Sequence, residues 1–148
     1  MTKKKEREIF DSREVFATFD EYIANFLPAE IMFTLRELAS RRKFGLLNES
    51  MYSEAVIDFV KNKIPEEVIS MLTNSICKDF ELRECSFSRH FIARLLIRFS
   101  GSAMNFLMTR IRRLFYYCCK HGKERGRENG IVLVVNPAAR EIITIFTC

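Results

Sequence analysis

The chain of 148 residues contains few glycines and prolines and no long run of apolar residues. Five glycines and three prolines are too few for the low-complexity and disordered classes of protein. No stretch approaches the roughly 18–20 consecutive apolar residues that span a bilayer. Residues 1–8 also lack the apolar segment of a secretory signal, so the sequence predicts a cytoplasmic protein with no membrane partner.

Metal-ligating patterns are missing as well. The number of cysteines is odd, and none of them shows Cys-x-x-Cys or Cys/His zinc spacing, so reduced thiols are expected. Residues 83–127, the most basic part of the chain, contain only Glu84 and Glu124 as acids, whereas a two-metal nuclease needs clustered carboxylates. The sequence therefore predicts no metal and no cofactor.

Positive charge is concentrated in that same segment. Residues 83–127 hold eleven basic residues against two acids, a net charge of +9, which leaves −4 for the rest of a chain with formal net charge +5. Nine of the eleven are arginines, whose planar guanidinium forms the bidentate contacts that phosphate favours. Because lysine and arginine release counterions from the phosphate backbone, this segment predicts a nucleic-acid interface. The alternative interpretation is a solvated basic face without a ligand.

Apolar residues at helical spacing predict four helices in residues 1–80. Each expected start is marked by a capping side chain or by a proline. These starts are Asp11 and Ser12, Pro28, Asn48 or Ser50, and Pro65. The region contains no histidine, and nothing in it indicates catalysis.

Residues 81–148 mix helix and strand patterns, and the predicted fold class is therefore α+β. Strands are expected at 80–87, 131–135 and 141–147, the last two as a hairpin. Helices are expected at 89–99, capped by Ser88, and at about 102–119, with Phe106 among the buried residues; a polar loop covers 120–130. An N-terminal bundle of about four helices is thus followed by two helices packed on a small antiparallel sheet. The regions 1–80 and 81–148 form either two units or one compact domain.

Three side chains in the basic segment share one predicted helix face. His90, Arg94 and Arg98 follow one another at intervals of four residues. Groups that carry charge of the same sign repel one another at this spacing, and an anion lying across the face would relieve the repulsion. A phosphate site is one interpretation of the pattern, and a solvated basic edge with an incidental histidine is the other.

The last 65 or so residues resemble a known superfamily through short motifs. The residues that carry the resemblance are Ser88, His90, Arg94 and Arg98 on the predicted helix, and Thr144 in the final strand. This part of the chain is similar to the metal-independent endoribonucleases that include barnase, colicin nuclease domains, RelE-type toxins and the phage enzyme RegB. In that group a Ser-x-His-x-x-x-Arg helix pattern often precedes an antiparallel sheet.

The resemblance implies cleavage of RNA by attack of the 2′-hydroxyl group. Histidine suits proton transfer near neutral pH, so His90 is the expected general base or acid and His121 the second member. Arg94 and Arg98 would hold the scissile phosphate, and Thr144 would donate a hydrogen bond to it. The residues expected to contact neighbouring phosphates are Arg89, Lys120, Lys123, Arg125 and Arg127. RNA is then the partner, together with an inhibitor protein if the chain is a toxin.

Two other functions fit the same sequence. A non-catalytic nucleic-acid-binding protein would keep the basic face and tolerate loss of His90. A helical interaction protein of viral or phage origin would inhibit a host factor through an apolar groove in the N-terminal helices. RNA cleavage in EDTA and salt-dependent RNA binding distinguish the three hypotheses.

Overall fold

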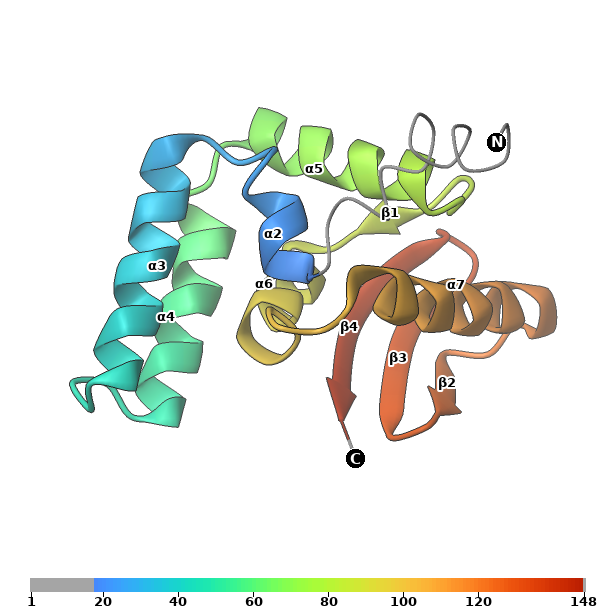
Figure 1. Ribbon diagram of the computed structural model, residues 1–148. Helices are drawn as coiled ribbons and strands as arrows, with labels where there is room; N and C mark the ends of the chain where they lie inside the picture. The colour runs from blue at the N-terminus through green and yellow to red at the C-terminus, as the bar shows by residue number, and fades with distance from the viewer. Residues whose placement is uncertain (1–17, 148) are drawn as a thin grey trace, which may run out of the picture.

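The computed structural model describes residues 18–147, which form helices and a four-stranded sheet (Figure 1). The predicted helix start at Asp11 and Ser12 lies outside these residues. In chain order the elements are α2 (Phe19–Ile23), α3 (Ala29–Lys43), α4 (Glu49–Asn62), α5 (Glu66–Asp79), β1 (Ser86–Phe87), α6 (Arg89–Arg98), α7 (Met104–His121), β2 (Arg125–Glu128), β3 (Ile131–Asn136) and β4 (Glu141–Thr147). The α+β class is confirmed, with helices first and the sheet at the C-terminal end.

Local sequence signals account for most helix starts. Pro28 and Pro65 directly precede α3 and α5, where a missing N–H group costs no helical hydrogen bond. The Asn48 side chain accepts a hydrogen bond from the Met51 amide and caps α4. Thr18 begins α2 with a capping box, in which its side chain and that of Glu21 each accept a backbone N–H. The helices predicted after Pro28, Asn48 and Pro65 are therefore confirmed.

The sheet has the strand order β1-β4-β3-β2 and is mixed, so the prediction of an antiparallel sheet is wrong for one pair. The β2–β3 and β3–β4 pairs are antiparallel, and the predicted hairpin is confirmed. β1 runs parallel to β4, because the chain crosses over through α6 and α7 before it returns beside β1.

Two strand boundaries also differ from the prediction. The strand expected at 80–87 is only Ser86–Phe87, since Glu81 and Glu84 have φ of 59° and 49° and turn the chain there. Conversely, the loop expected at 120–130 contains the strand β2.

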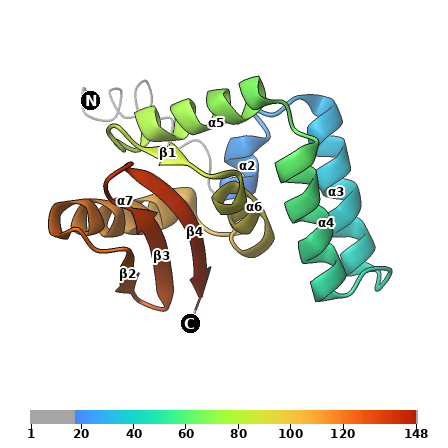
Figure 2. The same cartoon turned by 180° about the vertical axis from the view of Figure 1, so that it is seen from behind.

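The helical and basic regions share one hydrophobic core. Its buried side chains run from Phe19 in α2 to Ile145 in β4, with α7 packed against β2 and β3. Figure 2 shows the opposite face of β2, β3 and β4 with no helix of residues 18–147 lying across it. No helix in this described range has the length and apolar character needed to cross a bilayer.

Candidate nucleic-acid interface

His90 lies at the start of α6, where Ser88 fixes the backbone. The Ser88 hydroxyl accepts a hydrogen bond from the Phe91 amide at 3.0 Å and donates one to the Ile143 carbonyl in β4. The predicted cap is confirmed, and this hydroxyl is used within the fold. Partial burial, followed by the charges of Lys61 and Arg94, lowers the pKa of His90 below its ordinary value near 6.5. The imidazole is therefore mainly neutral at pH 7.

The lowered pKa of His90 predicts a pH-dependent loss of stability. Above pH 7 the imidazole is neutral in both states and contributes no pH dependence. As the pH falls through about 6.5, the unfolded chain takes up the proton first, so the free energy of unfolding decreases until folded His90 is also protonated. Urea unfolding at pH 7.5 and 5.5 should show a smaller loss for His90→Gln than for the parent. Equal losses in the two proteins would contradict this account.

The two histidines do not lie together. His121 ends α7 beside β2, and its ring contacts that of Tyr117 with the centroids 4.8 Å apart and the planes tilted by 51°. α6, which carries His90, contacts β4, and the strand β3 lies between β4 and β2 in the sheet. Figure 1 shows α6 beside β4 and the C-terminal end of α7 beside β2, so the two lie toward different edges of the sheet. The two histidines are therefore not placed to act as general acid and general base on the same phosphate.

The other residues expected at the catalytic site lie on α6 and on β4, two elements that contact one another. Arg98 is exposed in the last turn of α6. Arg94 Nε and Thr144 Oγ1 are both buried and have no hydrogen-bond partner within the described range. Strand register puts Thr144 in one row with Val134 and Arg125, on the sheet face turned away from α7.

Arg89, expected to contact phosphate, has its donors engaged within the fold. Its Nη1 donates to the carbonyl oxygens of Val60 and Ile64, each at 2.7 Å, just at the C-terminal end of α4. Its Nη2 forms an ion pair with Glu66 at 3.0 Å. Arg89 therefore joins α6 to α4 and α5, and we do not include it in the interface.

Four of the basic residues that have no acidic partner within residues 18–147 lie close together. Arg112 and Arg113 pair with Glu81 and Glu128, both at 2.9 Å. The cations around the end of α7 and along β2 form no ion pair within residues 18–147. We call this set the basic edge, and its members are Lys120, Lys123, Arg125 and Arg127. All four side chains are exposed, so the edge is a concentrated positive surface.

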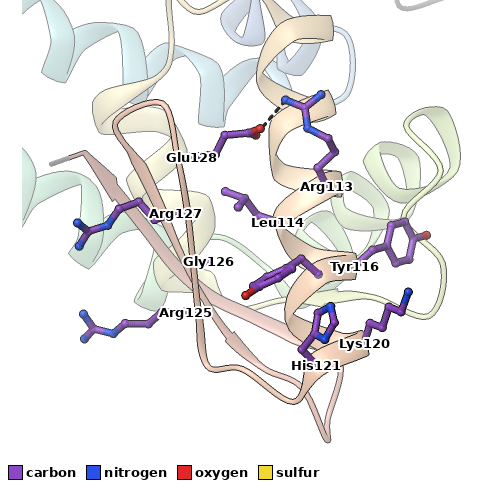
Figure 3. Close-up of a pocket in the computed structure, with 10 residues that line it drawn as sticks. Arg113, Leu114, Tyr116, Lys120, His121, Arg125, Gly126, Arg127 and Glu128 are labelled. Carbon is purple, nitrogen blue, oxygen red and sulfur yellow. Dashed lines mark hydrogen bonds and ion pairs between the residues drawn. The ribbon is translucent and has the colours of Figure 1, made fainter.

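A groove of about 690 Å³ separates α7 from β2 and adjoins the basic edge (Figure 3). Leu114 and Gly126 are its buried apolar floor, while Tyr117, Lys120 and His121 line the helix side. Gly126 allows β2 to approach, since a Cβ there would lie 3.1 Å from Cys118 Sγ and 3.1 Å from Leu114 Cδ2. Because Gly126 faces α7, its neighbours Arg125 and Arg127 project from the opposite face, as Figure 3 shows.

The Arg113–Glu128 ion pair crosses from α7 to the end of β2 at one end of this groove (Figure 3). A smaller space of about 250 Å³ continues along α7 on the other side of Arg113. The exposed face of α7 therefore borders two depressions, and Arg113 lines both of them.

Sequence reasoning singled out His121 for catalysis and Tyr117 for base stacking, but it did not identify the aromatic and basic stripe that they share on this face. Phe106 was expected to be buried but is 61% exposed, with the Arg110 guanidinium 4.1 Å from its ring centroid. Tyr117 is 48% exposed. The stripe consists of Phe106, Arg110, Arg113, Tyr117 and His121, at intervals of three or four residues. On a helical wheel of residues 104–121 these positions lie apart from the apolar face, so such a plot identifies the stripe from the sequence.

Comparison of the chain with models of protein families, with curated protein sequences and with solved structures gave no match. Within residues 18–147, no group of three or more histidine, cysteine or acidic side chains is arranged to hold a metal ion. The interpretation of the site therefore depends on its own geometry and charge.

Proposed function

We propose that the protein binds nucleic acid through the basic edge. The observation that carries this proposal is the clustering of Lys120, Lys123, Arg125 and Arg127, which are exposed and have no acidic partner within the described chain. Exposed cations held together on a folded scaffold neutralise successive phosphates and release their counterions. The groove and the stripe of α7 beside this edge provide surfaces for sugars and bases.

Binding without cleavage is the form of this function that the geometry supports best. Metal-independent cleavage by a histidine pair needs both imidazoles within hydrogen-bond reach of one phosphodiester. His90 lies beside Lys61 and Arg94 on α6, which contacts β4, whereas His121 lines the groove beside the edge strand β2. We therefore assign neither residue a catalytic role.

Replacing the four basic-edge residues with alanine is expected to weaken binding to a mixed RNA pool about 100-fold at low salt. The slope of log K against log salt should become shallower by about 3, because each phosphate contact on a single strand contributes roughly 0.7. Fluorescence anisotropy between 50 and 300 mM salt measures both quantities. The matched control replaces four exposed lysines elsewhere, Lys43, Lys61, Lys63 and Lys78, and should change binding only slightly.

The control distinguishes binding through the basic edge from a general effect of the protein's net charge. An equal loss in both four-residue variants would contradict the assignment to the basic edge, and absence of salt-dependent binding by the parent would contradict nucleic-acid binding itself. RNA incubated with the parent in EDTA should stay intact. Products with 2′,3′-cyclic phosphate that disappear in His90→Ala would instead support the endoribonuclease hypothesis.

A further inference from the structure

The groove between α7 and β2 combines an aromatic wall with an unpaired strand edge. The Tyr117 and His121 rings are in contact at a tilt of 51°, and the Tyr117 ring remains about half exposed. Among residues 18–147, β2 is the last strand of the sheet and pairs only with β3, so its other edge leaves backbone N–H and C=O groups without strand partners in this range. A planar, polar-edged ligand such as a nucleobase would stack on the ring and meet hydrogen-bonding groups at its rim.

The size and the aromatic lining of the groove favour single-stranded nucleic acid over a duplex. A volume of about 690 Å³ is within the range of sites for small ligands and accommodates a nucleotide or two. A duplex keeps its bases stacked inside the helix, where an aromatic wall cannot reach their faces. Single-stranded nucleic acid, in contrast, is bound by stacking of its exposed bases on aromatic rings combined with cations along its backbone.

Charges at the groove are placed for such a backbone. Lys120 lies on the helix side, and Arg127 continues the positive surface beyond the strand. Arg113 lies along the same path, but Glu128 occupies its guanidinium at 2.9 Å. A phosphate entering here would compete with the Glu128 carboxylate, which therefore opposes binding at this position.

We infer that the groove is a binding site for single-stranded RNA, with one base stacked on Tyr117 and the adjoining phosphates on Lys120 and the basic edge. This inference rests on the proposed function and adds the class of ligand. RNA is favoured over DNA because the Tyr117 side chain is about half exposed at the groove, where its hydroxyl can take a hydrogen-bond partner from the ligand. A ribose 2′-hydroxyl, which DNA lacks, would supply that partner.

The test uses the full chain and three labelled probes of one sequence: a 12-nucleotide RNA, its RNA duplex and the corresponding single-stranded DNA. Tyr117→Ala is expected to weaken binding of the single-stranded RNA about tenfold, in line with the loss of one stacked base. Binding of the duplex should be unchanged. Phe33→Ala, which removes an exposed aromatic on α3, is the matched control and should have no effect.

Two further variants examine the polar contacts. Tyr117→Phe should keep the affinity for single-stranded RNA within about threefold but abolish the preference for RNA over DNA. Glu128→Gln should strengthen RNA binding about threefold, because it releases Arg113 and removes a negative charge.

The outcomes separate this inference from the proposed function. Equal binding of single strand and duplex, both unaffected by Tyr117→Ala, would overturn the inference while leaving salt-dependent binding at the basic edge intact. Tighter binding of the DNA strand would overturn the assignment to RNA. Failure of every probe to bind would overturn the proposed function and the inference together.

Discussion

Replacing Arg89 with alanine is expected to lower the free energy of unfolding by about 3 kcal/mol. The substitution removes two charge-assisted hydrogen bonds and leaves the carbonyl oxygens of Val60 and Ile64 without this donor, and each such bond contributes about 1.5–3 kcal/mol. The Arg89 side chain is only 24% exposed, so water replaces the lost contacts incompletely. Urea unfolding followed by circular dichroism measures the change, with the m-value expected to stay constant.

Two further variants, Arg89→Lys and Glu66→Ala, show which of the Arg89 contacts contributes most to stability. Arg89→Lys keeps the positive charge but has no planar fork to reach two carbonyl groups, so we expect an intermediate loss. Glu66→Ala removes the exposed ion pair and the exposed hydrogen bond that the Ser70 hydroxyl donates to Glu66, and it should leave the unfolding midpoint nearly unchanged, because solvent screens such contacts. A stability of Arg89→Ala equal to that of the parent would contradict the structural role.

The same variant distinguishes a structural arginine from a phosphate ligand. Folded Arg89→Ala, assayed well below its unfolding midpoint, should bind RNA as the parent does, since its guanidinium is engaged with α4 and α5. A loss of RNA affinity as large as that caused by replacing a basic-edge residue would instead indicate that Arg89 contacts the RNA.

Arg89 also shows what sequence patterns leave out. Its type and position on a helix were predictable, but its acceptors lie 29 and 25 residues earlier in the chain, at the end of another helix. The sequence shows which residues carry charge, and only tertiary structure shows which charges are already paired. For the same reason the His90, Arg94 and Arg98 pattern could be recognised as a helix, while its distance from His121 could not.

The strands also differ in how well the local sequence predicts them. β3 and β4 contain β-branched residues that face the core, and this local pattern predicts them correctly. β2 reads Arg-Gly-Arg-Glu, and the residue between its arginines that faces α7 is Gly126, so no apolar side chain marks this strand. The strand expected at 80–87 is shortened by a long-range contact, because the Tyr116 hydroxyl donates to the Glu81 carbonyl and accepts from the Arg83 amide.

Gly126→Val is expected to separate β2 from α7. Valine ordinarily favours a strand, but here its Cβ would begin 3.1 Å from both Cys118 Sγ and Leu114 Cδ2, and two further methyl groups would extend into the same space. Overpacking of this kind costs about 1–3 kcal/mol, and we expect a loss near 2 kcal/mol in urea unfolding. Since Gly126 is also the floor of the groove, the preference for single-stranded over duplex RNA should be lost in the same variant.

A graded series makes this expectation specific to the contact between the helix and the strand. Gly126→Ala adds only the Cβ, which neighbouring side chains accommodate by shifting a few tenths of an ångström, so its effect on stability should be well below that of valine. Gly101→Ala adds the same atom where nothing lies within 4 Å and should be nearly neutral in both stability and binding. If Gly126→Val retains the stability and the single-strand preference of the parent, β2 does not pack on α7 at this distance, and the groove loses its role as the RNA site. If valine reduces both while alanine at position 101 reduces neither, the close approach of β2 is what shapes the site.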